Sequence, residues 1–268
     1  MLVKSMSFTD IIVEKKDRVV WITLNKPNVR NAMGKQTLIE IASAIEDVEK
    51  DPDSIALVIR GASNTFCSGM DTRENPQPDG QNVSEFTVLA DRMFLSIDRM
   101  KKVSIAVVEG YCMAGGFELA LVCDLIFAEE NCKMGDGHIN LPGFVPNGGS
   151  SIRLPRLIGT RKAKEILFSG DLISGKEAER IGLVNRAVSA EMLQKTVEDF
   201  VYKLAEKSPI GLEYMKMLVN KSTECTLDAG LSLERTAVNY LGGTEDRHEA
   251  MAAFKEKRKP VYKGRSAG

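Results

Sequence analysis

The sequence predicts an α/β protein whose first part holds a parallel sheet covered by helices and whose last part is helical. Two observations carry this prediction. Up to about residue 155, short apolar segments alternate with segments of helical periodicity, as expected for a sheet buried on both faces. Beyond that point the periodic segments are helical. We therefore divide the 268 residues into a core at 1–195 and a C-terminal helical region at 196–268.

Five segments are expected to form strands. Residues 11–14 and 19–24 are rich in β-branched side chains and flank a charged turn, so they predict a hairpin. Pro27 ends the second strand, because proline cannot donate to a strand ladder. The other three segments are short and apolar, which is typical of buried strands: 55–59, 103–108 and 125–128.

Apolar residues spaced by three and four predict amphipathic helices between and after the strands. These segments span residues 38–48, 86–100 and 193–204, and a polar loop is expected at 74–83. Three further helix starts carry a local signal: the pair Gly115-Gly116, the capping box of Ser174 and Glu177, and the dipeptide Ser208-Pro209.

Composition excludes several classes of function. Charged residues make up 27% of the chain and the formal net charge is -1, so neither nucleic acid nor an acidic membrane surface is expected as a partner. The cysteines number five and lack C-x-x-C spacing, which argues against a disulfide framework and a metal site. No signal-peptide core is present, and no apolar run reaches the roughly 18 residues of a membrane span. We expect a soluble, cytoplasmic protein.

Two glycine-containing turns follow two of the buried strands, at residues 66–71 and 109–118. The second turn runs into a helix start, where backbone N–H groups lack internal partners and carry the positive end of the helix dipole. Two backbone N–H groups converging from these turns would stabilise an enolate or a tetrahedral oxyanion. Taken alone, each turn is a weak signal, because a glycine pair before a helix more often reflects tight packing.

Several motifs in a fixed order carry a resemblance to a known family. The stretch IAVVEGYCMAGGFELALVCD at 105–124 and FCSGMD at 66–71 resemble the two signature segments of the enoyl-CoA hydratase/isomerase (crotonase) family. Further matches follow at 148–149, 153–159, 169–174, 178–184 and 251–260. The resemblance implies a crotonase-like spiral of ββα units with a helical C-terminal trimerisation region. It also implies an acyl-CoA thioester substrate, a homotrimer or hexamer, and no cofactor apart from the CoA of the substrate.

The resemblance also assigns residues to the thioester. Its carbonyl would lie between the amides of Met70 and Gly115. Residues that would bind the CoA arm, together with these two, are Ser68, Asp71, Thr72 and Arg73. Phe254 and Lys257 of the C-terminal segment would reach the CoA of a neighbouring subunit.

Glu118 is the first candidate for the chemistry. It lies three residues after Gly115, about one helical turn away, and so projects from near the face of the oxyanion amide. Its position resembles that of the family's first catalytic glutamate, which would deprotonate water. A glutamate at a helix start is also favoured by the dipole alone.

The second catalytic position departs from the family pattern, because His138 stands where hydratases usually carry a glutamate. A neutral imidazole can take or give a proton near pH 7, although a lone histidine is more often a hydrogen-bonded structural residue. Asp136 would share a face with His138 if both lay in a strand, and would then orient the ring or cap a turn. His248, among charged neighbours, is expected on a solvated helix surface.

These residues favour an acyl-CoA lyase that hydrates a 2-enoyl-CoA or dehydrates the product, with Glu118 on the water and His138 on the C2 proton. The histidine keeps other reactions of an enolate open: isomerisation, C–C hydrolysis, decarboxylation and retro-aldol cleavage. The alternative to an enzyme is a non-catalytic relative that binds CoA. The loop at 74–83 and the helix at 86–100 are expected to form the acyl pocket.

Overall fold

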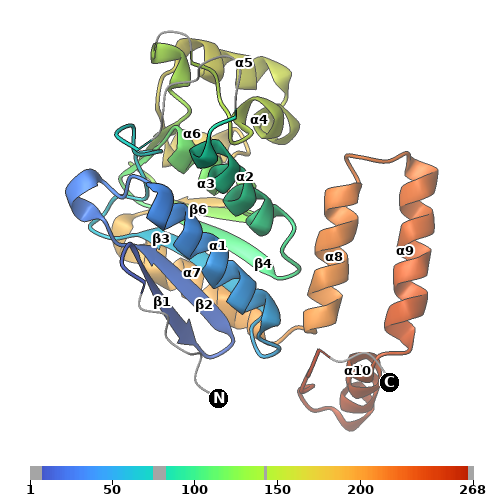
Figure 1. Ribbon diagram of the computed structural model, residues 1–268. Coiled ribbons are helices and arrows are strands. Elements are labelled where there is room, and N and C mark those ends of the chain that lie inside the picture. Colours follow the sequence, from blue (N-terminus) through green and yellow to red (C-terminus); the bar gives the residue numbers. More distant parts are fainter. Residues whose placement is uncertain (1–7, 75–82, 142–143, 265–268) are drawn as a thin grey trace.

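The computed structural model describes residues 8–74, 83–141 and 144–264 and shows the predicted α/β core with helices beside it (Figure 1). Strands β1 (Ile11–Lys16) and β2 (Val19–Leu24) form the predicted antiparallel hairpin. From β2 onward the sheet is parallel, in the order β1-β2-β3-β4-β6-β9. Its other strands are β3 (Ala56–Gly61), β4 (Val103–Val108), β6 (Leu125–Glu129) and β9 (Arg186–Val188).

The central strands are mostly apolar, as expected for a sheet that helices cover on both faces. On one face Ile22, Ile59 and Ala106 join a core with α1 (Lys35–Lys50) and α2 (Glu85–Asp98). On the other face Trp21 and Val58 pack against α7 (Ala190–Ala205), which Figure 1 shows across the sheet from α1. Burial of each large apolar side chain stabilises this arrangement by about 1.5–3 kcal/mol.

A second, small sheet was not predicted. Its strands are β5 (Tyr111–Met113), β7 (Lys133–Gly135) and β8 (Ile173–Ser174), in the order β5-β7-β8. Segments of two or three residues are too short to show a period of two, so the sequence gives no signal for them. This sheet matters for function because β5 leads into Gly115 and β7 leads into Asp136.

Short helices surround this small sheet. Helix α3 (Gly115–Val122) follows β5, and the single turn η2 (His138–Asn140) follows β7. Helices α4 (Ser150–Ile158) and α5 (Thr160–Ser169) were not assigned from the sequence. The predicted cap is confirmed: Ser174 Oγ accepts the Glu177 N–H at 3.1 Å and starts α6 (Gly175–Arg180). The remaining single turn is η1 (Pro27–Val29).

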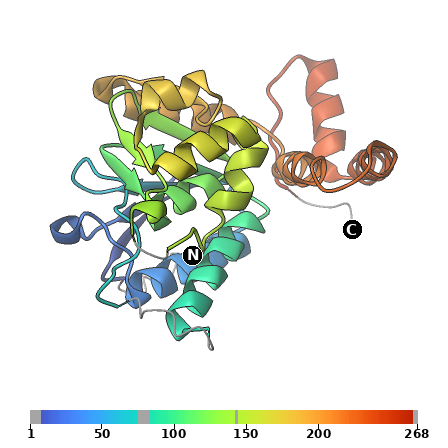
Figure 2. The same cartoon turned by 90° about the horizontal axis from the view of Figure 1, so that it is seen from above.

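Three helices lie to one side of the core: α8 (Pro209–Lys221), α9 (Leu227–Gly242) and α10 (Glu245–Glu256), as Figures 1 and 2 both show. The predicted boundary at 195/196 falls inside α7, which packs on the sheet. Lys216 ties α8 to the core through Asp124 at 2.7 Å and the Lys102 carbonyl at 3.0 Å. Within the three described ranges, no helix has both the length and the apolar character needed to cross a membrane.

Candidate active site

Backbone hydrogen bonds fasten the two glycine-containing turns to each other. The Cys67 N–H donates to the Tyr111 carbonyl at 3.0 Å, and the Met113 N–H donates to the Cys67 carbonyl at 3.0 Å. On its other side, the first turn pairs with Met33, whose N–H donates to the Gly69 carbonyl at 2.9 Å. The turn at 66–71 is therefore held between two neighbouring segments.

The amides of Met70 and Gly115 are brought together as expected. A Cβ placed on Gly115 would lie 3.2 Å from Met70 N, and one placed on Gly69 would lie 3.4 Å from Gly115 N. Within the part of the chain that the structure describes, neither N–H has an internal hydrogen-bond acceptor. Two adjacent, unpaired amides at a helix start can receive a carbonyl oxygen that gains negative charge.

Where the two turns meet, one residue has no room for a side chain and another has a strained backbone. A Cβ on Gly116 would lie 2.3 Å from the Cys67 carbonyl oxygen, so only glycine fits there. Ala114, which caps α3, has φ 48° and ψ -122°, a conformation that strains any residue with a Cβ. The strain sits one residue before the Gly115 amide.

Two buried cysteines flank this backbone. Cys67 and Cys112 are fully buried and face each other across the bridge between the turns. The Cys67 thiol donates to the Asn31 carbonyl at 3.1 Å. Burial raises the pKa of the Cys67 thiol to about 12, and burial also raises the pKa of Cys112. Both therefore remain thiols at neutral pH.

Glu118 lies in α3 with 2% of its surface exposed. Its Oε1 accepts the N–H of Gly148 at 2.6 Å and the N–H of Ser150 at 3.3 Å. These amides belong to the start of α4, where a negative charge is stabilised by the unpaired donors. Glu118 is thus held by a helix other than its own, which goes beyond the dipole effect foreseen from the sequence.

His138 and Asp136 form a tight pair, although not in a strand as considered from the sequence. Strand β7 ends at Gly135, and Gly137 takes a left-handed conformation with φ +68°. Asp136 Oδ1 then lies 2.8 Å from His138 Nδ1 and accepts the His138 N–H at 3.2 Å. Asp136 therefore both caps the turn and binds the ring. The two alternatives considered from the sequence occur together.

The three groups influence one another electrostatically. Burial raises the pKa of Glu118, although the nearby His138 lowers it in part. Burial disfavours the His138 imidazolium, but the Asp136 and Glu118 carboxylates outweigh it and leave the pKa of His138 raised. Burial likewise opposes ionisation of Asp136, yet the contacts with His138 hold its pKa below the ordinary value. The protonation of each group therefore depends on the other two, and such a cluster can hold and move a proton.

The residues expected along the CoA arm lie together in the turn that follows Met70. Asp71 is 4% exposed and makes a two-point ion pair with Arg73, at 2.9 Å to Nε and 2.6 Å to a terminal nitrogen. The Arg73 contact holds the pKa of Asp71 at about 2. The guanidinium and Thr72 are exposed, and the Ser68 hydroxyl donates to the Val29 carbonyl at 3.3 Å. Their contact with CoA remains a prediction.

Other predicted residues lie elsewhere. Phe254 is 80% exposed near the end of α10, and Lys257 caps the same helix. Most of the predicted loop at 74–83 lies outside the described residues. In the helix predicted at 86–100, Phe94 borders the site, because a Cβ on Gly148 would lie 2.5 Å from its ring and 2.7 Å from Glu118 Oε2. Sequence reasoning missed Gly148 and Ser150, whose backbone amides carry no residue-type signal.

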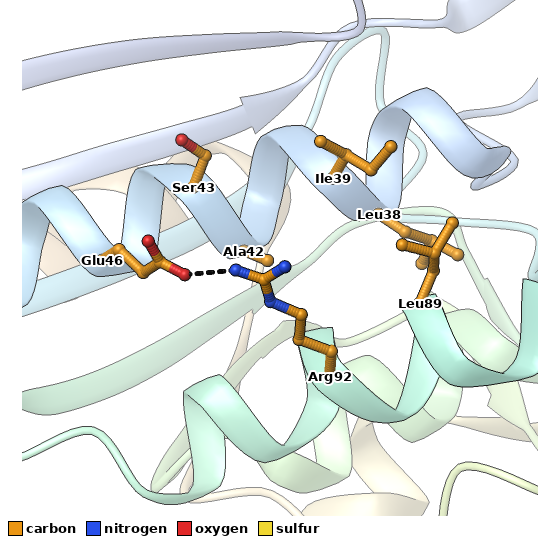
Figure 3. A pocket seen from close by; sticks show the side chains of 7 residues that line it. All are labelled: Leu38, Ile39, Ala42, Ser43, Glu46, Leu89 and Arg92. Carbon is orange, nitrogen blue, oxygen red and sulfur yellow. Dashed lines mark hydrogen bonds and ion pairs between the residues drawn. The ribbon is translucent and has the colours of Figure 1, made fainter. Parts of the chain in front are cut away.

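A surface cavity of about 200 Å³ between α1 and α2 contains none of these groups. It is lined by Leu38, Ile39 and Leu89, and one rim is closed by the ion pair of Arg92 with Glu46 at 2.6 Å (Figure 3). Exposed pairs of this kind contribute about 0–1 kcal/mol. The cavity is separate from the cluster around Glu118.

Comparisons with known proteins agree over nearly the whole chain. The family described as Enoyl-CoA hydratase/isomerase matches residues 14–265. The chain is 35% identical to the crotonyl-CoA hydratase of Syntrophomonas wolfei, covering 96% of this chain and 99% of that protein. It is 33% identical to the short-chain-enoyl-CoA hydratase of Clostridium acetobutylicum, covering 95% and 97%. The structure of enoyl-CoA hydratase from Bacillus anthracis superimposes with a TM-score of 0.91 at 30% identity, covering 96% and 100%.

Proposed function

Because this chain belongs to the enoyl-CoA hydratase/isomerase family, we propose that it is an acyl-CoA lyase that adds water to a 2-enoyl-CoA thioester or removes it from the product. The structural match confirms the predicted crotonase-like fold with a helical C-terminal region. The observation that carries the proposal is local. The amides of Met70 and Gly115 lie side by side without an acceptor among the described residues, Glu118 follows Gly115 by one turn of α3, and His138 acts electrostatically on Glu118.

The amides would act on the thioester oxygen. When a nucleophile attacks C3 of a 2-enoyl thioester, electrons move through C2 onto this oxygen and form an enolate. The N–H groups of Met70 and Gly115 stabilise that negative charge more than they stabilise the neutral carbonyl, which lowers the barrier. Both amides are fixed before the substrate binds, so no free energy is needed to orient them during the reaction.

Glu118 and His138 would divide the two proton transfers. Glu118 accepts a proton from water as the water oxygen bonds to C3. The His138 imidazolium donates a proton to C2, which neutralises the enolate and restores the thioester carbonyl. The product has gained one water molecule, and the proton left on Glu118 then returns to His138. CoA leaves with the product, and the reaction needs no further cofactor.

The direct test is the loss of crotonyl-CoA absorbance with purified protein and with Glu118→Gln. We expect hydration by the unmodified protein and a fall in kcat of about 10³-fold in the variant, because the amide cannot accept the proton of water. Glu165→Gln, in an exposed i,i+3 pair of α5, serves as the matched control and should keep full activity. Full turnover in Glu118→Gln would remove Glu118 from the mechanism.

The assembly is part of the proposal. Helices α8–α10 expose large apolar side chains at Met215, Val219, Leu227, Val238 and Phe254, which supports burial between subunits of a homotrimer or hexamer. Light scattering coupled to gel filtration measures the mass directly, and a monomer at micromolar concentration would refute the assembly. The five cysteines are free thiols, which supports a reducing compartment such as the cytoplasm.

A further inference from the structure

We propose that Asp136 is a positioning residue, which fixes the rotation of the His138 ring and keeps a proton on Nδ1, so that Nε2 exchanges the proton with the substrate. The Ser150 hydroxyl supports the second oxygen of Asp136. The role of Nε2 rests on the proposed function, whereas the contact between Asp136 and His138 can be tested without it.

A single oxygen of Asp136 holds His138 at two points. Asp136 Oδ1 lies 2.8 Å from Nδ1 and accepts the His138 N–H at 3.2 Å. Because the backbone and the ring are bound by the same atom, the imidazole cannot rotate without losing a partly buried hydrogen bond. The nitrogen that carries the proton in a neutral imidazole is set by the bond that the other nitrogen makes. Among the described residues Nε2 makes no hydrogen bond, so it is available for reaction.

The second oxygen of Asp136 has one suitable neighbour. Asp136 Oδ2 and Ser150 Oγ are the two buried side-chain polar atoms that lack a hydrogen-bond partner within the described residues. Ser150 is fully buried and lies beside Asp136. A serine hydroxyl rotates about its C–O bond and can therefore donate to Oδ2. The Ser150 N–H at the same time donates to Glu118, so one residue contacts both carboxylates.

The charges around the ring favour a proton on it. Asp136 and Glu118 are the charged groups that act on His138, and both are negative. Helix α5 packs against η2, and α4 packs against α3. The charged side chains of α4 and α5 are exposed or half-exposed: Arg153, Arg156, Arg161, Lys162, Lys164 and Glu165. Burial opposes the imidazolium, but the two carboxylates leave the pKa of His138 raised. The two carboxylates thereby favour the protonated ring, from which a proton can be donated.

Asp136→Asn tests the proposal on the whole, substrate-free protein, because asparagine keeps the shape and removes the charge. The probe is nuclear magnetic resonance of protein labelled with ¹⁵N-histidine, which contains only His138 and His248. His248, on α10, is the internal reference. We expect the titration midpoint of His138 to fall by about one pH unit and its Nδ1–H tautomer to be lost, while His248 is unchanged.

The kinetic counterpart is a fall in kcat of about 10²-fold with KM for crotonyl-CoA preserved. Asp171→Asn, at an exposed position, is the matched control and should leave both measurements unchanged. An unchanged midpoint and tautomer in Asp136→Asn would overturn the positioning role, whatever the activity. If the unmodified protein does not hydrate crotonyl-CoA, the proposed function fails while the spectra still decide the role of Asp136.

Ser150→Ala provides a second variant should Asp136→Asn fail to fold. Loss of the hydroxyl leaves Oδ2 without a donor and weakens the carboxylate as a partner of the ring. The midpoint of His138 should fall in the same direction by a smaller amount, with the tautomer kept. A midpoint equal to that of the unmodified protein would exclude the contribution of Ser150, and a rise would contradict the proposal.

Discussion

Backbone atoms build one half of the candidate site, and side chains build the other. The amides of Met70 and Gly115 are fixed by a network of main-chain hydrogen bonds between two turns and Met33. Glu118 and His138 instead depend on a few contacts from the segment at 136–150. In the backbone half, a Cβ added to Gly116 would lie 2.3 Å from the Cys67 carbonyl oxygen. In the side-chain half, each titratable group is held by contacts with individual residues, and the departure from the family pattern expected at His138 concerns this half.

The largest effect is expected in the side-chain half. His138→Ala removes the group that we assign to the C2 proton, so kcat should fall by about 10³-fold while KM for crotonyl-CoA is kept. Steady-state kinetics measure both constants. His248→Ala, on α10, is the matched control and should behave like the unmodified protein. Unchanged turnover in His138→Ala would make this histidine structural and leave Glu118 as the sole acid–base group.

The backbone half should respond to a single methyl group. In Gly116→Ala the new Cβ would lie 2.3 Å from the Cys67 carbonyl oxygen, which belongs to the main chain and cannot move alone. We expect the free energy of unfolding to fall by about 3 kcal/mol and hydration to be lost. Urea denaturation measures the first quantity. Gly242→Ala, where a Cβ meets nothing within 4 Å, is the control and should not destabilise. Equal stability in the two variants would contradict the close approach of the turns.

The pH dependence separates the halves, because amides do not titrate in the physiological range. The active form of the pair holds one proton, so kcat/KM should follow a bell. Burial raises the pKa of Glu118 above 4.5, and the carboxylates raise that of His138 above 6.5, so both limbs are displaced to higher pH. Activity should fall about tenfold per pH unit outside the limbs. A profile without an alkaline limb would contradict proton donation by His138.

The pKa shifts of His138 and Asp136 also determine the direction in which stability changes with pH. The partners of His138 stabilise the fold most fully below the unfolded pKa of 6.5, and this contribution is lost as the pH rises through the raised folded value. Asp136, with a lowered pKa, contributes above 3.8, and its contribution is lost as the pH falls through the folded value. Stability in the unmodified protein should therefore decline on both sides of this window.

The smallest expected effect concerns the strained residue between the turns. Ala114→Gly removes the Cβ from a backbone with φ 48° and ψ -122°, so the free energy of unfolding should rise by about 1 kcal/mol. The same change at Ala229, an exposed position in α9, should lower it by about 0.5–1 kcal/mol. Thermal unfolding compares the two. A loss of stability in Ala114→Gly would show that the methyl group contributes packing that outweighs the strain.

Patterns of apolar residues sufficed to predict the main sheet and its covering helices, because these elements bury a continuous face. Examples are the run at β4 and the spacing along α1. The small sheet was not predicted, because strands such as β5 and β7 pair over only three residues. In the site, Glu118 and the amides of Met70 and Gly115 were predicted from the motifs at 66–71 and 105–124. The contact of Asp136 with His138 was considered from the sequence, although in a strand and not in the turn that forms it. The hydrogen bond from Gly148 to Glu118 depends on loop geometry that residue types do not encode.

The buried cysteines have a chemical consequence for an enzyme that handles 2-enoyl thioesters. Such thioesters are Michael acceptors, which alkylate thiolates at the same carbon that water attacks in hydration. Cys67 lies three residues before Met70, yet burial raises its pKa to about 12. At pH 7 only about one Cys67 thiol in 10⁵ is therefore ionised. The packing that aligns the turns thus also protects the protein from covalent inactivation by its own substrate.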